Sequence, residues 1–284
     1  TVLQWLRSRP DTKGTKEGCA EGDCGACTVV IGELSDDDTI RYTAIDSCLV
    51  FLPMLDGKQL ITVECLSNHP QTKDDLHPVQ QAMVDTDGSQ CGYCTPGFIM
   101  SLFALYKQGA NPDRTETCDA LTGNLCRCTG YRPIAEAAAR SCAAPAADTI
   151  ASQEPATIAA LRELAASANP LLIQTSTQRY LRPMSLEAAL ASIAEDASLL
   201  PFNGATDLAL RVTKRHEVLP ALLDLSGINA LRRIEILPDN IRIGAGCSLE
   251  SIRRTVRDRL PALAAILDVF GSRQIRSLAT IGGN

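Results

Sequence analysis

Four cysteines near the start of the chain have a spacing that suits one kind of metal chemistry. They are Cys19, Cys24, Cys27 and Cys48, with four, two and twenty residues between them. This is the plant-type [2Fe–2S] spacing. The loop must approach a cluster closely and adopt positive φ angles, for which it has Gly18, Gly22 and Gly25. A structural zinc site is the alternative, but zinc ribbons use two short cysteine pairs, so the spacing favours an iron–sulfur cluster.

A second set of four cysteines follows, with 31 residues between its two pairs: Cys91, Cys94, Cys126 and Cys128. The sequence predicts a helix directly after Cys94, with Thr95 as N-cap and Pro96 at the first helical position. Cys128 precedes a helix expected from Pro133 to Arg140. The partial positive charge at helix N-termini favours thiolate over thiol. Taken alone, this spacing suits zinc as well as a cluster, and the ferredoxin-type loop before it favours a second cluster.

The other potential metal ligands and charged groups show no comparable pattern. We expect four further cysteines to be small buried hydrophobes, namely Cys65, Cys118, Cys142 and Cys247. The histidines lie in polar surroundings without ligand-like partners, and we assign no role to His69, His77 and His216. The acidic run 36–38 predicts a solvated turn between two strands. One helix is expected to present three side chains to solvent, those of Arg253, Arg254 and Arg257.

Composition limits the classes of function. The chain of 284 residues has 27 Lys and Arg against 33 Asp and Glu, a formal charge of −6, and no basic cluster, which disfavours nucleic-acid binding. Clustered cysteines in a chain of this length indicate metal binding rather than disulfides, and no apolar run is long enough for a membrane span. We therefore expect a cytoplasmic protein. The chain starts at Thr1 and stops at Asn284 in a way that suggests truncation at both ends.

The order of the expected elements divides the chain into four parts. Residues 1–66 predict a small α+β domain, with strands at 28–31, 41–44 and 60–63. Residues 67–145 predict an all-helical domain. Residues 146–177 predict a linker with one weak helix at 158–165. Residues 178–284 alternate strands with helices and predict an α/β domain.

Three strings around the cysteines resemble the xanthine oxidase family of molybdenum hydroxylases. They are Glu17-Gly-Cys-Ala-Glu-Gly-Asp-Cys-Gly-Ala-Cys-Thr-Val29, Gly88-Ser-Gln-Cys-Gly-Tyr-Cys-Thr-Pro-Gly97 and Gly123-Asn-Leu-Cys-Arg-Cys-Thr-Gly-Tyr131. The resemblance implies a ferredoxin-like β-grasp domain and then a helical-bundle domain, each with a [2Fe–2S] cluster. It also implies that Gln90 contacts the molybdopterin of a neighbouring polypeptide.

The third domain resembles the FAD-binding domain of the same family. By that resemblance, the first flavin loop contains Pro201, Phe202, Asn203, Gly204, Ala205, Thr206, Asp207 and Leu208. The second contains Thr280, Gly283 and Asn284, and Phe270 would pack against the cofactor. Glycines and small hydroxyl residues let backbone N–H groups approach a pyrophosphate. Gly244-Ala-Gly246 begins a dinucleotide fingerprint, but Leu249 replaces its third glycine, so we reject that motif.

The family resemblance implies an electron-transfer chain without catalytic residues of its own. Electrons from a molybdopterin centre on a large partner subunit would pass through both clusters to FAD, and then to NAD or oxygen. Xanthine or hypoxanthine is the expected substrate, with aldehydes, carbon monoxide or other N-heterocycles as alternatives, and a heterotetramer or larger assembly is expected. The chain departs from the family by lacking the first β-hairpin and by ending at the second flavin loop, which places FAD retention in doubt.

Overall fold

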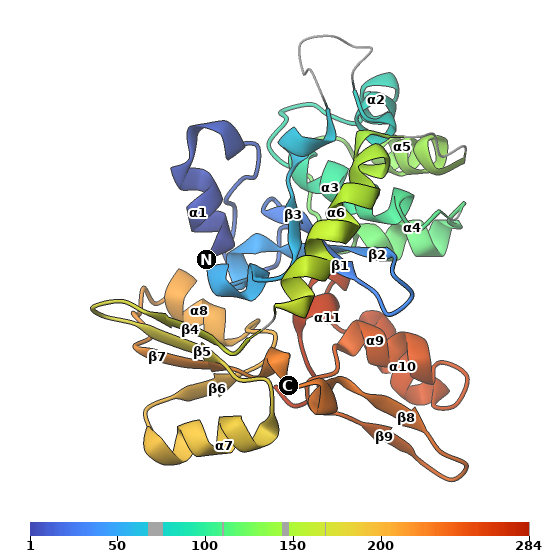
Figure 1. Ribbon diagram of the computed structural model, residues 1–284. Coiled ribbons are helices and arrows are strands. Elements are labelled where there is room, and N and C mark those ends of the chain that lie inside the picture. The colour runs from blue at the N-terminus through green and yellow to red at the C-terminus, as the bar shows by residue number, and fades with distance from the viewer. Residues whose placement is uncertain (68–75, 110, 144–147, 168, 284) are drawn as a thin grey trace. The chain divides into compact units, whose positions relative to one another are not determined.

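The computed structural model describes residues 1–67, 76–109, 111–143, 148–167 and 169–283. Residue contacts divide the chain into two compact units. Unit 1 comprises residues 1–48, 55–167 and 272–274, and unit 2 comprises residues 49–54, 168–271 and 275–284. The expected mixture of helices and strands is confirmed, and Figure 1 shows the elements.

Unit 1 contains a three-stranded antiparallel sheet near the three strands that the sequence predicts. Strands β1 (Thr28–Leu34), β2 (Ile40–Asp46) and β3 (Gln59–Ile61) pair in the order β2-β1-β3. The turn between β1 and β2 exposes Asp36, Asp37 and Asp38, as expected for a solvated turn. A preceding helix, α1 (Val2–Ser8), is capped by Thr1, and it buries Val2, Leu3 and Leu6.

The helices of unit 1 surround one almost wholly apolar helix. Helix α3 (Thr95–Tyr106) is buried along nearly its whole length and packs on β1. Around it lie α2 (Pro78–Asp85), α4 (Arg114–Leu121) and α5 (Arg132–Ala143) (Figure 1). The prediction that Thr95 is the N-cap of α3 is wrong. Cys94 is the N-cap, because its carbonyl accepts the first helical bond from Phe98 N at 3.1 Å.

Two further expectations for unit 1 need correction. Helix α6 (Thr149–Ala166) has 18 residues and is longer than the helix expected at 158–165. It begins earlier because Asp148 is its N-cap, with Oδ1 accepting from Ala151 N at 2.6 Å. His77 is 3% exposed and packs edge-on against Phe103 and Tyr106, so apolar rings border it in addition to the polar group near its Nε2, which lies 3.4 Å from Asp148 Oδ2. Its Nδ1 accepts from Val79 N and so caps α2.

Unit 2 contains a four-stranded mixed sheet of order β4-β5-β7-β6. The strands are β4 (Leu171–Gln174), β5 (Arg179–Arg182), β6 (Leu200–Phe202) and β7 (Ala221–Asp224). Helix α7 (Leu186–Glu195) buries Ala189 against Ala221 and Leu223 of the sheet. Parallel pairing of β5 and β6 with β7 agrees with the expected alternation of strands and helices.

A second layer of unit 2 combines a hairpin with two helices. Strands β8 (Ile234–Ile236) and β9 (Ile241–Ile243) pair antiparallel. Helices α9 (Leu249–Val256) and α10 (Pro261–Val269) share an apolar core that includes Leu249, Ile252 and Leu267. Short helices α8 (Leu208–Thr213) and α11 (Arg273–Leu278) complete the fold. None of the helices in the described ranges is both long and apolar enough to cross a membrane.

Candidate functional site: two cysteine sets and a pair of glycine-rich loops

The first cysteine loop folds so that its backbone N–H groups point at sulfur. Cys19 Sγ accepts from the backbone N–H groups of Glu21, Asp23 and Cys24 at 3.3 to 3.4 Å. Cys19 N in turn donates to Cys24 Sγ at 3.3 Å. The bond from the Cys24 thiol, followed by these backbone bonds, lowers the pKa of Cys19 to about 5. Donors aimed at sulfur are what a bound, negatively charged cluster requires.

Gly18 and Gly25 serve the first loop as expected. A Cβ atom at Gly18 would lie 2.7 Å from Cys24 Sγ, so a side chain there would displace the sulfur. Gly25 has a φ of 65°, in the left-handed region that favours glycine. The loop can therefore close around its sulfurs only with glycine at these positions.

The second half of the first set is buried at the base of the sheet. Cys27 directly precedes β1 and Cys48 follows β2, and their Sγ atoms lie 3.4 Å apart. Both side chains are almost wholly buried, at 2% and 0% exposure. The antiparallel pairing of Thr28 with Asp46 brings the two cysteines together across 20 residues of sequence.

Asp46 was not predicted as part of this site. It is fully buried, and its Oδ1 lies 3.7 Å from Cys27 Sγ. Burial, followed by the negative charge of Cys19, raises the pKa of Asp46 to about 8. A carboxyl group that is protonated near neutral pH can donate to a thiolate. Its position two residues before Cys48 was the only signal in the sequence.

The second cysteine set is also brought together, on loops that precede helices. The Cys94 thiol contacts Cys126, and Cys128 contacts Cys91. Cys91 and Cys128 are exposed, whereas Cys94 and Cys126 are partly buried. The structure therefore gathers all four ligands that the sequence predicted, but closer to the surface than the first set.

Cys126 Sγ accepts three hydrogen bonds, two of them from Thr129. The Thr129 hydroxyl donates at 3.2 Å, and the backbone N–H groups of Thr129 and Cys128 donate at 3.4 Å each. Burial opposes ionisation, but these hydrogen bonds outweigh it and lower the pKa of Cys126 to about 7. Thr129 follows the cysteines in the Arg-Cys-Thr-Gly string, where its hydroxyl was not recognised.

Within each set, the thiols contact one another in pairs. Across the part of the chain that the structure describes, no three His, Cys, Asp or Glu side chains are arranged to hold one metal ion. A single zinc ion needs four ligands around one point, whereas the four thiolates of a [2Fe–2S] cluster divide between two irons. Paired thiols with N–H donors at sulfur therefore fit the cluster better than zinc.

The expectation for the remaining cysteines is confirmed for two and wrong for two. Cys142 and Cys247 are buried, and burial raises the pKa of each thiol. Cys65 and Cys118 are exposed. Cys65 lies in a short 3₁₀ helix and Cys118 on the outer face of α4. The general tendency of cysteine to be buried does not show which face of a helix a particular cysteine occupies.

In unit 2 the two predicted flavin loops lie side by side. Thr280 Oγ1 donates to the carbonyl of Asn203 at 3.3 Å. Gly204 and Ala205 both have positive φ angles, of 77° and 64°. A Cβ atom at Gly204 would lie 2.1 Å from the carbonyl oxygen of Leu278, so only glycine permits this close approach. A turn of this kind can direct backbone N–H groups at a pyrophosphate.

The other predicted flavin residues divide into core and surface positions. Phe202 is buried against Phe51 and Tyr180, with ring centroids 5.7 and 6.2 Å apart, so its side chain belongs to the core. Ala205 is buried, while Pro201, Asp207 and Gly283 are exposed, and Thr206, Leu208 and Phe270 are partly buried. Phe270 packs against the core of α9 and α10. Asn284 lies outside the described residues, and Gln90 is exposed one residue before Cys91.

A third glycine turn, which sequence reasoning set aside, joins the two flavin loops. Gly282 N donates to the Ala245 carbonyl at 2.9 Å. A Cβ atom at Gly246 would lie 2.5 Å from Asn203 Nδ2, which is buried and has no hydrogen-bond partner among the described residues. Gly244-Ala-Gly246 is therefore part of this loop cluster, and its two glycines were the signal.

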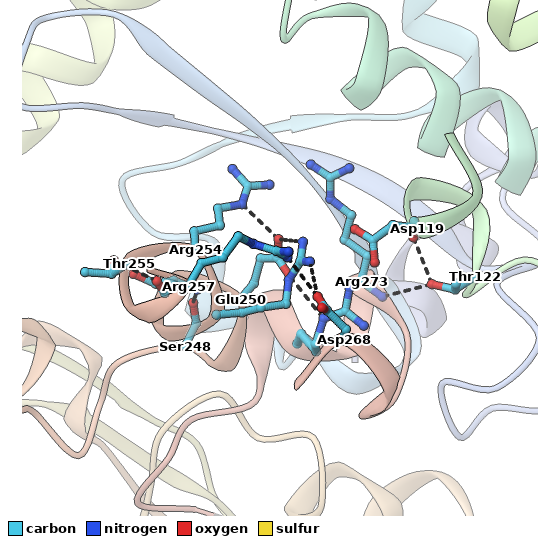
Figure 2. A network of polar contacts seen from close by, with 12 residues as sticks. Asp119, Thr122, Ser248, Glu250, Arg254, Thr255, Arg257, Asp268 and Arg273 are labelled. Carbon is cyan, nitrogen blue, oxygen red and sulfur yellow. Dashed lines mark hydrogen bonds and ion pairs between the residues drawn. The ribbon is translucent and has the colours of Figure 1, made fainter. Parts of the chain in front are cut away.

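A charged cluster in unit 2 holds the chain between α10 and α11. Glu250 is 6% exposed and binds Arg253, Arg254 and the fully buried Arg276 at 2.8 to 3.0 Å. Figure 2 shows Glu250 with Arg254. Arg276 also donates to the carbonyls of Phe270 and Gly271. Burial opposes ionisation of Glu250, but hydrogen bonds from the three arginines lower its pKa to about 2. The expectation that Arg253 faces solvent is wrong, because it bridges Glu250 and Asp268, whereas Arg254 and Arg257 are about half exposed.

Comparisons with known proteins agree with this geometry. The family described as "[2Fe-2S] binding domain" matches residues 62–139, and "FAD binding domain in molybdopterin dehydrogenase" matches residues 174–284. The chain therefore carries a [2Fe–2S] binding domain and an FAD binding domain of the kind found in molybdopterin dehydrogenases. Over its whole length it is 31% identical to xanthine dehydrogenase of Drosophila subobscura, covering 24% of that protein. It is also 31% identical to aldehyde oxidase 2 of Cavia porcellus, again over the whole chain and covering 25% of that protein.

Among solved structures, quinoline 2-oxidoreductase from Pseudomonas putida 86 is similar over 57% of this chain and 83% of its own. The identity is 31% and the TM-score 0.40. The chain spans about a quarter of the length of the two curated relatives, xanthine dehydrogenase and aldehyde oxidase 2.

Proposed function

We propose that this chain is the electron-transfer part of a molybdenum hydroxylase, carrying electrons from a molybdopterin centre outside the chain through two [2Fe–2S] clusters to FAD. Residues 1–66 form a ferredoxin-like β-grasp domain, 67–145 a helical [2Fe–2S] domain, 146–177 a linker and 178–284 an FAD-binding domain. The observation that supports the proposal best is the gathering of eight cysteines, far apart in sequence, into thiol pairs that accept backbone N–H groups.

The residues of the chain hold and tune these groups rather than perform acid–base chemistry. Cys19, Cys24, Cys27 and Cys48 bind one cluster, and Cys91, Cys94, Cys126 and Cys128 bind the other. The backbone around Gly204 and Thr280 binds the FAD pyrophosphate. FAD is suited to this end of the path because it accepts single electrons and releases a pair as hydride. None of the residues in this chain is assigned as a catalytic acid, base or nucleophile.

The partner is a molybdopterin-binding large subunit or domain, which Gln90 contacts in a heterotetramer or larger assembly. Xanthine or hypoxanthine is the substrate, and NAD or oxygen is the final electron acceptor. The similarity to xanthine dehydrogenases over the whole chain supports this choice. Cluster thiolates need a reducing compartment, which supports a cytoplasmic location.

A second candidate substrate class is favoured by a specific comparison. Aldehyde oxidase 2 of Cavia porcellus is 31% identical to this chain, the same identity as that of xanthine dehydrogenase of Drosophila subobscura. An aldehyde-oxidising enzyme would use the same electron path, since substrate recognition belongs to the molybdopterin-binding part.

Metal and flavin analysis of the freshly isolated holoprotein tests the electron-transfer proposal. We expect about four irons per chain for two [2Fe–2S] clusters and one FAD. Protein with stoichiometric zinc and no iron would overturn the proposal. Assays of the same preparation with xanthine and with an aromatic aldehyde would then distinguish the two substrate classes.

A further inference from the structure

Asn124 links the two cysteine regions of unit 1. It is 3% exposed and lies two residues before Cys126. Its Nδ2 nevertheless donates to the loop of the other cysteine set, reaching Gly25 O and Thr28 Oγ1 at 3.1 Å each. Gly25 and Thr28 flank Cys27, and Thr28 Oγ1 itself donates to Gly25 O at 2.7 Å. Asn124 therefore fixes the turn that positions Cys27.

The turn at Gly25 is tightly packed against the segments before Cys126 and after Cys94, and glycines at these contacts allow the close approach. A Cβ atom at Gly25 would lie 2.1 Å from the carbonyl oxygen of Gly123, beside Asn124. A Cβ atom at Gly97, just after Cys94, would lie 2.1 Å from the Gly25 carbonyl oxygen. Leu125 N also donates to Cys24 O at 3.0 Å. The Gly25 carbonyl is thus inserted between the segments that lead to Cys94 and Cys126.

Gln274 determines the orientation of the Asn124 amide. It is fully buried, and its Nε2 donates to Asn124 Oδ1 at 3.0 Å across 150 residues of sequence. Ser101 Oγ donates to the same Oδ1 at 2.6 Å and accepts from Gln274 Nε2 at 2.9 Å. Since Oδ1 receives both donors, Nδ2 must point toward Gly25.

We propose that Asn124 and Gln274 are positioning residues for the ferredoxin-type cluster: their side-chain amides form a buried relay that fixes the Gly25–Thr28 turn around Cys27. This inference rests on the proposed function, because it assumes a cluster in each cysteine set. Hydrogen bonds and loop geometry around the ligands set cluster potentials. Removing the relay should therefore change the cluster of Cys27 although Asn124 belongs, by sequence, to the loop of Cys126.

The test compares variants of the holoprotein by EPR of the reduced clusters and by redox titration. Asn124→Leu keeps the approximate side-chain volume and removes every amide hydrogen bond. Gln274→Met removes the far end of the relay and is distant in sequence from all eight cysteines. Thr122→Val is the matched control, because Thr122 Oγ1 binds Arg273 N at 3.3 Å beside Gln274 but lies outside the relay (Figure 2). Cys48→Ser and Cys126→Ser assign the two EPR signals.

We expect Asn124→Leu to change the g-values and midpoint potential of the signal that Cys48→Ser removes. Gln274→Met should shift the same signal in the same direction by a smaller amount, and the double variant should shift it no further than Asn124→Leu alone. Thr122→Val should leave it unchanged.

An unchanged signal in Gln274→Met and Asn124→Leu, at full iron content, would overturn the inference. So would an equal shift in Thr122→Val, which would indicate general loosening of the segment. If Asn124→Leu does not fold, Gln274→Met decides the question. Absence of iron from the unmodified protein would instead refute the proposed function, so the two failures are distinguishable.

Discussion

Unit 1 and unit 2 secure their candidate cofactor loops with different chemistry. In unit 1 the loop of Cys27 is tied by neutral amides, those of Asn124 and Gln274. In unit 2 the turn at Phe270 is tied by the buried ion pair of Glu250 and Arg276. Neutral hydrogen bonds keep extra charge away from thiolates that must bind iron. Ion pairs can be stronger where buried, but they depend on pH.

The largest effect is expected from the removal of one cluster ligand in unit 1. Cys126→Ser should abolish one of two reduced-state EPR signals and about half of the iron, because serine is a poor ligand for this cluster. Cys118→Ser is the control, since Cys118 is exposed and belongs to neither set. Retention of both signals in Cys126→Ser would contradict the second cluster.

A smaller effect is expected from a glycine in unit 2. Gly204→Ala should reduce FAD retention at least about tenfold, because a Cβ atom must displace the Leu278 carbonyl at a positive φ, and 1.4 kcal/mol corresponds to tenfold. The measurement is flavin content after gel filtration. Gly57→Ala in unit 1 has the same φ of 77° but open space around it, so its effect on the free energy of unfolding measures backbone strain without a close contact. Equal flavin in Gly204→Ala and the unmodified protein would argue against this loop.

Acid should weaken unit 2 through Glu250. Its pKa is lowered from 4.5 to about 2, so it stabilises the folded state fully above pH 4.5, and this stabilisation is lost as the pH falls toward 2. The amount is at most about 3 kcal/mol. Glu250→Gln should lose a similar amount at neutral pH, since Arg276 remains buried without its counter-charge. Denaturant unfolding as a function of pH measures both, and a Glu250→Gln variant with unchanged pH dependence would contradict the assignment.

The smallest effect should come from an exposed ion pair of unit 1. Arg162 and Asp38 lie 2.9 Å apart, but their side chains are 52% and 61% exposed. Arg162→Gln should therefore change the free energy of unfolding by less than about 1 kcal/mol. Denaturant unfolding beside Glu250→Gln provides the comparison. If Arg162→Gln lowered the free energy of unfolding as much as Glu250→Gln, burial would not explain the difference in strength between the two ion pairs.

The sequence by itself singled out the cysteines and the flavin-loop residues that meet in the candidate sites. The cysteine spacing and the glycines at 18, 25 and 204 indicated the candidate loops. The short strand-like and helical segments predicted the sheet of unit 1, the helix after Cys94 and the alternation in unit 2. These features are local, because glycine and the spacing of thiols restrict the backbone wherever the chain folds.

Only the tertiary structure decided the supporting contacts. Asp46 beside Cys27, Gln274 against Asn124, and Arg276 with Glu250 join residues 19, 150 and 26 positions apart in the chain. An amide or an arginine has no fixed periodicity, so its partner and its burial depend on which distant segments pack together. For the same reason the sequence misplaced Arg253, which reaches Asp268 on α10, and His77, which packs against Phe103 and Tyr106 on α3.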